Sequence, residues 1–382
     1  MSDDFDIGGK TAEDLLELYF SSVDFNNDDF SQEEMDKSMS YLKAAADKGS
    51  PEAWAELGAC YFMGYGIKQD EILAHDYLEK AALKNVANAQ MNLYCLMRDK
   101  AQTDEEKKNS LYWLNQAVEN KVPSALYETG SLYYHGIVYE QDFKKAAKYM
   151  QLSAEANCPE AMATLGVMYQ QGQGVDKDMS KAIEYFAKAA DEGSYSGLCN
   201  LANAYMGGLG VEQDYSEAMA CFAALVDLDE PFYSPDLNDP DVRADIALVF
   251  HQTNVYEMTY PMAHHNLGIM FQQGLGTDVD QSAALYHFML ASENGYAPSC
   301  LQAGSMLYAG EGIDRAEPEK AFEYLSVALD AGIPEAKLIL GIMYFCGEGV
   351  KEDKEKGIAF LDELIAMGNV TAIKAKNDLL NN

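Results

Sequence analysis

The chain of 382 residues carries 62 acidic and 27 basic side chains, for a formal net charge of −35. A surface of this charge repels nucleic acid and anionic membranes, which excludes both as expected partners, and it attracts basic segments of proteins. The hydrophobic fraction of 48% is large enough for an extended core, so general disorder is not expected.

The sequence shows no sign of export or membrane insertion. Residues 1–6 lack the basic segment and the apolar run of a secretory signal. No stretch approaches the roughly 18 uninterrupted apolar residues of a membrane span. The seven Cys have no C-x-x-C spacing and are typical of small buried side chains in a reducing compartment. We therefore expect free thiols and a cytoplasmic protein.

Residues 1–50 are expected to form an N-terminal cap and a degenerate half repeat. Residues 11–20 have the pattern of a capping helix, and residues 33–48 have that of a lone second helix. Ser40 and Lys43 match the S-x-x-K of serine acyl enzymes, but the companion motifs are missing, so we interpret them as residues of a helix.

The possible metal ligands are equally incomplete. Asp24 to Asp28 begin like a calcium loop, but Asp29 stands where that loop needs Gly, and Met35 where it needs Glu. His264 and His265 are adjacent, so they point about 100° apart on a helix and make a poor ligand pair. We expect no catalytic residues, no cofactor and no metal.

A repeat begins after residue 50, where a Leu-Gly pair or a close equivalent recurs. We call the second residue of this pair the ruler position, and successive ruler positions are 36, 36, 36, 36, 66, 36 and 37 residues apart. The ruler positions are Gly58, Tyr94, Gly130, Gly166, Ala202, Gly268, Gly304 and Gly341. Such a period predicts stacked repeats, with repeats one to five in residues 51–226 and repeats six to eight in residues 261–369.

Each repeat is expected to contain two helices, which we call helix A and helix B. In helix A a small residue precedes the ruler position by five and a large one follows it by three, as Ala161 and Tyr169 do around Gly166. A glycine pair such as Gly172 and Gly174 then ends helix A, because Gly adopts the left-handed conformation readily. An acid that suits the N-cap starts helix B, and these acids are Asp70, Asp142, Asp178, Asp214, Asp280 and Asp353.

Two turns depart from this pattern. Repeat two has no glycine pair in residues 98–104, although Thr103 or Asp104 can still cap the next helix. Repeat three keeps Gly136 and has Val138 at the second site. We expect both turns to differ in shape from the others.

Residues 227–260 form an insertion of about 30 residues, judged from the interval of 66 against 36. Pro240 after Asp239 predicts a capped short helix at about 240–250, with Ile246, Val249 and Phe250 facing the repeats. Residues 370–382 are expected to form a C-terminal capping helix, with Ala372 in the small column and Leu380 in the large one.

The repeat resembles the Sel1-like repeat family, which is related to tetratricopeptide repeats. The motif A-x-x-x-L-G-x-x-Y-x-x-G-x-G-V-x-x-D is complete from Ala161 to Asp178, and the resemblance covers roughly residues 37–377 with one interruption. It implies an all-α, right-handed α/α superhelical solenoid of about eight helix-turn-helix repeats with degenerate end caps. It also implies an adaptor that assembles other proteins.

We therefore expect a non-catalytic scaffold that binds a protein or peptide along the concave face of helix A. The candidate contacts lie two residues before the ruler position, together with Asn203 from the adjoining column. They are Glu56, Asn92, Glu128, Thr164, Asn200, Asn203, Asn266 and Gln302. Carboxamides both donate and accept, which suits the backbone of an extended peptide. The alternative is an enzyme or regulator, β-lactamase-like or of another kind, acting through the insertion or an unrecognised site.

Overall fold

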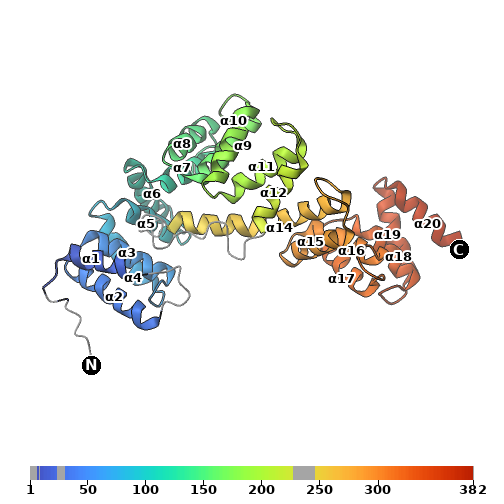
Figure 1. Ribbon diagram of the computed structural model, residues 1–382, viewed down its shortest axis with the longest axis horizontal. Coiled ribbons are helices and arrows are strands. Elements are labelled where there is room, and N and C mark those ends of the chain that lie inside the picture. Colours follow the sequence, from blue (N-terminus) through green and yellow to red (C-terminus); the bar gives the residue numbers. More distant parts are fainter. Residues whose placement is uncertain (1–6, 8, 24–30, 227–245, 382) are drawn as a thin grey trace. The chain divides into compact units, whose positions relative to one another are not determined.

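The computed structural model describes residues 7, 9–23, 31–226 and 246–381, with only the backbone of residues 246–256 (Figure 1). The described residues contain helices and turns and no strand, which confirms an all-α repeat fold. They divide into two compact units. Of the described residues, the first unit holds those up to Gly197 and residues 246–254, and the second holds residues 198–226 and 255–381.

The first unit opens with α1 (Ala12–Ser22) and α2 (Gln32–Asp47), which pack against each other. Four pairs of helix A and helix B follow. They are α3 (Pro51–Met63) with α4 (Glu71–Ala82), α5 (Ala87–Arg98) with α6 (Asp104–Glu119), α7 (Pro123–His135) with α8 (Phe143–Glu155), and α9 (Pro159–Gln171) with α10 (Met179–Asp191).

The alternation continues into the second unit. The next pairs are α11 (Tyr195–Gly207) with α12 (Tyr215–Val226), α14 (Ile246–Gln273) with α15 (Gln281–Glu293), α16 (Ala297–Ala309) with α17 (Pro318–Asp330), and α18 (Ala336–Cys346) with α19 (Lys354–Ala366). The second unit holds α11 from Leu198 and α14 from Val255. The helix α20 (Val370–Asn381) packs against α18 and α19. Within the described part of the chain, no helix combines the length and apolarity needed to cross a bilayer.

The predicted helix ends are confirmed. Asp178 begins α10 by accepting the backbone N–H of Lys181 at 3.0 Å, and the other five predicted acids accept backbone N–H groups in the same way. Thr103 caps α6 in the broken turn of repeat two, where Glu106 accepts the N–H of Thr103 in return. Gly172 and Gly174 have φ values of +74° and +73°. These residues therefore stop one helix and start the next at fixed points.

The ruler position brings helix A against helix B of the same repeat. A Cβ at Gly166 would lie 2.6 Å from the ring of Phe186, and one at Gly268 would lie 2.7 Å from the ring of Phe288. A second contact stacks two rings, as in Tyr169 with Tyr185, whose centroids are 5.6 Å apart. The small column therefore permits close approach, and the large column fills the space beside it.

The second glycine of the turn joins one repeat to the one before it. A Cβ at Gly174 would lie 1.9 Å from the carbonyl oxygen of Phe143, the first residue of α8. A Cβ at Gly312 would lie 2.3 Å from the carbonyl oxygen of Gln281, and one at Gly349 would lie 2.3 Å from that of Pro318; these two residues begin α15 and α17. We call this arrangement the regular junction. Only Gly satisfies both its positive φ and its close backbone contact.

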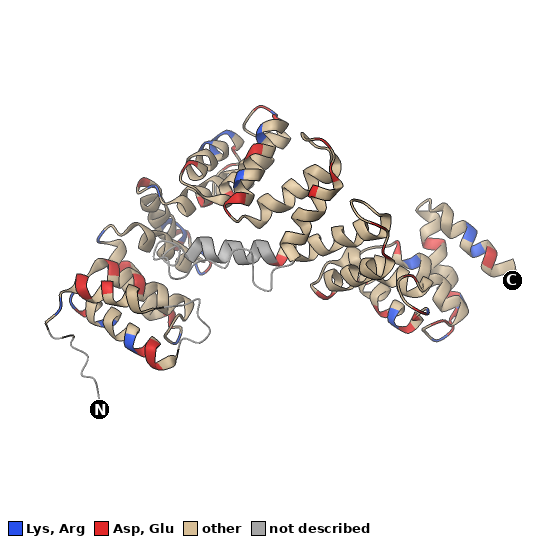
Figure 2. Cartoon of the chain, viewed as in Figure 1, with Lys and Arg blue, Asp and Glu red and all other residues tan. Residues whose placement is uncertain are grey.

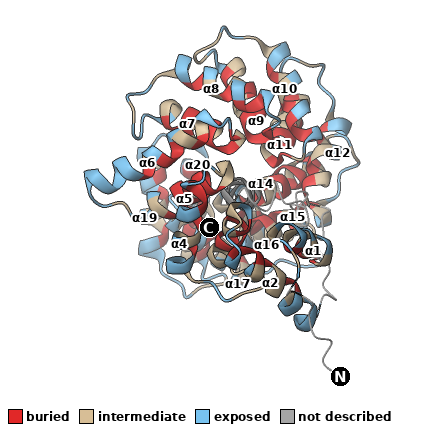
Figure 3. Cartoon of the chain, turned by 90° about the vertical axis from the view of Figure 1, so that its left-hand side faces the viewer, coloured by how far each residue is buried: buried red, intermediate tan, exposed pale blue. Residues whose placement is uncertain are grey.

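The core of each unit is built from these contacts. The largest fully buried side chains include Phe186 in the first unit and Phe222 and Phe288 in the second. Figure 3 shows buried residues on the sides of helices that face other helices, with exposed residues on the turns and outer sides. All seven cysteines are free thiols, and five of them are buried.

Three expectations need correction or qualification. Residues 246–250 do not form a separate short helix, because they begin the 28-residue helix α14. Pro261 stands where Pro51 and Pro159 begin helix A, yet α14 runs through it. The side chains of Ile246, Val249 and Phe250, and residues 240–245, lie outside the described structure. In α20, Ala372 is buried as expected but Leu380 is exposed.

Candidate functional site

The candidate column starts in a closed part of the first unit. Glu56 is 4% exposed, and its Oε1 accepts a hydrogen bond from the Tyr19 hydroxyl of α1 at 3.0 Å. Asn92 is 1% exposed. The pattern of one helix A places these residues opposite its core-facing side, but neighbouring helices cover that side as well. These two side chains therefore hold the unit together and are not available to a partner in this structure.

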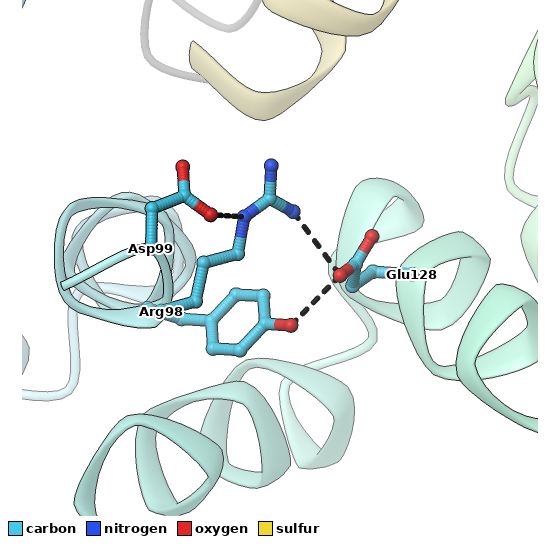
Figure 4. Close-up of polar contacts among 4 residues, drawn as sticks. Arg98, Asp99 and Glu128 are labelled. Carbon is cyan, nitrogen blue, oxygen red and sulfur yellow. Dashed lines mark hydrogen bonds and ion pairs between the residues drawn. The ribbon is translucent and has the colours of Figure 1, made fainter. Parts of the chain in front are cut away.

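The third member, Glu128, forms a cluster with residues of repeat two (Figure 4). Its Oε1 accepts hydrogen bonds from the Tyr94 hydroxyl at 2.7 Å and from Nη1 of Arg98 at 3.1 Å. Nε of Arg98 also bonds to Asp99. Burial, and then the charge of Glu128, raises the pKa of Tyr94, so its hydroxyl stays a donor. The cluster therefore ties α5 to α7.

This cluster was not predicted, although the sequence carried a signal for it. Tyr94 is the one large residue at a ruler position, where the other repeats have Gly or Ala. The side chain of Tyr94 is buried, and its hydroxyl bonds to Glu128 of α7. Arg98, one of three arginines in the chain, lies one turn further along α5.

A cavity of about 580 Å³ opens beside the cluster. Leu111 of α6, Leu132 of α7 and the turn residues Ile137 and Val138 line it together with the charged groups. Val138 does not adopt the positive φ of the second glycine. The turn of repeat three therefore differs from the regular junction, as predicted. The cavity lies next to this irregular turn.

The remaining members of the column are more open. Thr164 in the first unit is half-buried, as are Asn200, Asn203 and Gln302 in the second. Asn203 donates to the carbonyl oxygen of Cys199 at 2.9 Å, and Asn266 is buried. Thr164 is hydrogen-bonded to Tyr127, so Asn200 and Gln302 are the predicted side chains that a ligand could reach without rearrangement.

The second unit contains a histidine cluster in which His264 pairs with a histidine of helix B. The sequence did not predict this pair, because its two members come from different helices. Nδ1 of His264 lies 2.8 Å from Nδ1 of His287, and Nδ1 of His265 lies 2.8 Å from the Ser299 hydroxyl. Burial, and then the neighbouring His287, lowers the pKa of His264 to about 4. Burial alone lowers the pKa of His265 to about 4.

These histidines are expected to make stability depend on pH. The folded state holds His264 and His265 neutral, whereas an unfolded imidazole takes up a proton below about pH 6.5. Their contribution is present above pH 6.5 and is lost as the pH falls toward 4, by about 1 kcal/mol per histidine between pH 7.5 and 5.5. Thermal unfolding of the second unit at these two pH values measures it.

The control for this prediction replaces the histidines singly. The difference in stability between pH 7.5 and 5.5 should shrink in His264→Leu and in His265→Gln. It should persist in His135→Gln, which changes an exposed histidine. An unchanged difference in the first two variants would show that other groups carry the pH dependence.

Ser40 and Lys43 of the S-x-x-K match form no hydrogen bond with each other in α2. The Ser40 hydroxyl donates to the carbonyl oxygen of Lys37 at 2.6 Å, and Lys43 is exposed on the same helix. No group of three His, Cys, Asp or Glu residues in the described part of the chain could hold a metal ion. The candidate calcium loop at residues 24–28 lies outside the described residues.

Comparison with known families decides the class of repeat. The Sel1 repeat matches seven segments that together cover most of the chain. They are residues 51–86, 123–158, 159–194, 196–229, 261–296, 297–333 and 334–369. The chain belongs to the Sel1 repeat family. The pair α5 and α6 is not among the matched segments, which agrees with Tyr94 and the broken turn of repeat two.

A solved Sel1 repeat protein shares the fold. A crystal structure of a Sel1 repeat protein from Oxalobacter formigenes is 22% identical, covers 87% of each chain and has a TM-score of 0.57. A protective antigen of uropathogenic Escherichia coli with this repeat fold is also 22% identical, over 97% of this chain and 88% of its own, with a TM-score of 0.49.

One curated relative shares a shorter stretch. The ERAD-associated E3 ubiquitin-protein ligase component HRD3B of Arabidopsis thaliana is 34% identical over 93 residues, which are 24% of this chain and 14% of the relative. The match therefore spans a small part of that protein.

Proposed function

We propose that this Sel1 repeat protein is a non-catalytic scaffold that binds a protein or peptide along the helix A column. The observation that carries the proposal is the half-buried polar side chains that recur in this column within the second unit, namely Asn200 and Gln302. Donors and acceptors that recur along helix A suit the backbone of an extended segment. The relative from Arabidopsis is named as a component of a ligase, which supports a role within an assembly.

The proposed partner carries basic segments. Figure 2 shows acidic residues on helices of both units, and the formal net charge of −35 favours association with positive charge. The same charge opposes nucleic acid as a ligand. We also propose a cytoplasmic location, supported by the seven free thiols.

The proposal is tested by capture of partners from the host of the protein. The variant Asn200→Ala with Gln302→Ala is expected to lose roughly thirtyfold in affinity for a captured partner at an unchanged melting temperature, because each of the two lost hydrogen bonds contributes about 1 kcal/mol. Asn203 and Asn266 are left intact, since one bonds to its own helix and the other is buried. Affinity is measured by titration calorimetry with the purified partner.

The matched control is Asn109→Ala with Asn377→Ala, which removes two exposed carboxamides outside the column. Equal binding by both double variants and the natural chain would contradict the column as the site. Loss of binding on deletion of 230–245 alone would favour the alternative site in the insertion.

A further inference from the structure

A second cavity lies on the first unit, where α4 begins and the turn after α5 passes. Its volume is about 370 Å³. Ile72, Leu96 and Met97 form its apolar part, and the charged residues at its edge are Glu71, Asp76, Glu106 and Lys100. Ile72 is 77% exposed although it lies beside the buried Leu96. None of these residues belongs to the helix A column.

The cavity exists because the regular junction is missing here. Four residues separate the end of α5 from Thr103, the N-cap of α6, whereas six residues separate the end of α9 from the N-cap Asp178. The shorter turn also has no glycine that could contact the backbone of the first residue of α4. That residue is Glu71, and it meets the side chain of Lys100 instead of a glycine backbone.

The ion pair that replaces the junction is weak. Glu71 and Lys100 are both about half exposed, and an exposed pair of this kind contributes little to stability. A basic side chain from another protein can therefore take the place of Lys100 on Glu71 at small cost. Asp76 and Glu106 give the edge of the cavity an excess of negative charge.

We propose that this cavity is a docking site for a short protein segment in which aliphatic side chains are flanked by arginine or lysine. The aliphatic side chains cover Ile72 and Met97, and the basic side chains bind Glu71 and Asp76. The proposal rests on the scaffold function in one respect, which is that the ligand is a protein. The cavity itself is separate from the helix A column.

The test uses a fluorescein-labelled peptide, Ser-Arg-Leu-Leu-Arg-Ser, titrated with the full chain and followed by fluorescence anisotropy. Saturable binding is expected. A peptide with Ser in place of both Leu should bind at least about tenfold more weakly, because a buried Leu contributes about 1.5–3 kcal/mol. A peptide with Glu in place of both Arg should not bind measurably, because its charge has the same sign as the edge of the cavity.

Two variants of the protein locate the binding. Ile72→Lys places a charge in the apolar part of the cavity and should weaken binding about tenfold or more. Replacement of residues 99–102 by the sequence of residues 172–177 restores a glycine turn, which should close the cavity over Glu71 and abolish binding. Val370→Lys is the matched control, since Val370 is 76% exposed on α20, and it should bind as the natural chain does.

Each opposite result overturns the proposal. Equal binding of the Leu and Ser peptides would mean adhesion to an acidic surface only. Full binding by Ile72→Lys, or by the turn replacement with an unchanged melting temperature, would place the peptide elsewhere. Self-association that Ile72→Lys abolishes would identify a second copy as the occupant. If the helix A column proves not to bind a partner, the expected peptide affinities stay the same, because neither Asn200 nor Gln302 lines this cavity.

Discussion

Replacement of Gly174 by alanine is expected to destabilise the first unit by roughly 3 to 5 kcal/mol, because two costs coincide there. The new Cβ would lie 1.9 Å from the carbonyl oxygen of Phe143 and 2.9 Å from the backbone nitrogen of Lys144. Backbone atoms cannot move aside unless the start of α8 moves with them. The positive φ of +73° adds a conformational cost for any L side chain.

The control separates these two costs. Gly49 has a φ of +88°, and its nearest neighbour for an added Cβ is 4.0 Å away, on the ring of Trp54. Gly49→Ala should therefore lose only about 1–2 kcal/mol, from the backbone conformation alone. Urea unfolding followed by circular dichroism gives the stability, and hydrogen exchange in α8 and α9 shows whether the loss is local. Equal losses in both variants would show that α8 yields freely to the added atom.

Replacement of Phe186 by alanine is expected to destabilise the first unit by about 3–5 kcal/mol. The ring is 1% exposed and lies on Gly166 of the same repeat. Its loss leaves a cavity between α9 and α10 that these two helices cannot close without breaking their regular contacts. Urea unfolding measures the change, and Tyr112→Ala, at an exposed ring, should change stability by no more than about 0.5 kcal/mol.

A double variant makes this prediction more specific. Gly166→Ala alone should destabilise the protein, because its Cβ would lie 2.6 Å from the ring of Phe186. In the Phe186→Ala background the same change should cost clearly less, since the ring is gone and only the 3.1 Å approach to the carbonyl oxygen of Ala182 remains. An equal cost in both backgrounds would mean that the two residues do not share this contact.

Much of the fold could be predicted because each column of the repeat has a single physical role. Gly166 had to be small, Gly174 had to turn the chain, and Asp178 had to cap a helix, and all three do so. The right-handed superhelix stays a prediction. Such roles are local or involve the next element along the chain, so one sequence is enough to recognise them.

The candidate site was harder to predict, because burial in a stack depends on helices that one helix does not reveal. Glu56 and Asn92 were placed on an open face from the periodicity of helix A alone. In the structure Glu56 bonds to Tyr19 of α1, and Glu128 bonds to Tyr94 of α5. A helical wheel describes one interface and carries no information about the neighbouring helix A.

The start of α14 escaped prediction for a related reason. Pro261 occupies the repeat position at which Pro51 and Pro159 begin their helices, so the pattern indicates a helix start at Pro261. The helix extends upstream of it instead. The sequence of residues 246–260 has no glycine that would stop a helix before the proline.

The regular junction also bears on how such a chain can change its length during evolution. Its contact joins a glycine to a backbone carbonyl, as in Gly312 on Gln281 and Gly349 on Pro318, and uses no particular side chain. A repeat duplicated or deleted as a whole, with its glycine pair, therefore meets a compatible neighbour on either side. The junction of repeats one and two has no such glycine, and a weak ion pair between the side chains of Lys100 and Glu71 lies there instead. Gain and loss of repeats should accordingly be concentrated from repeat four onward, while the order of the first three is preserved.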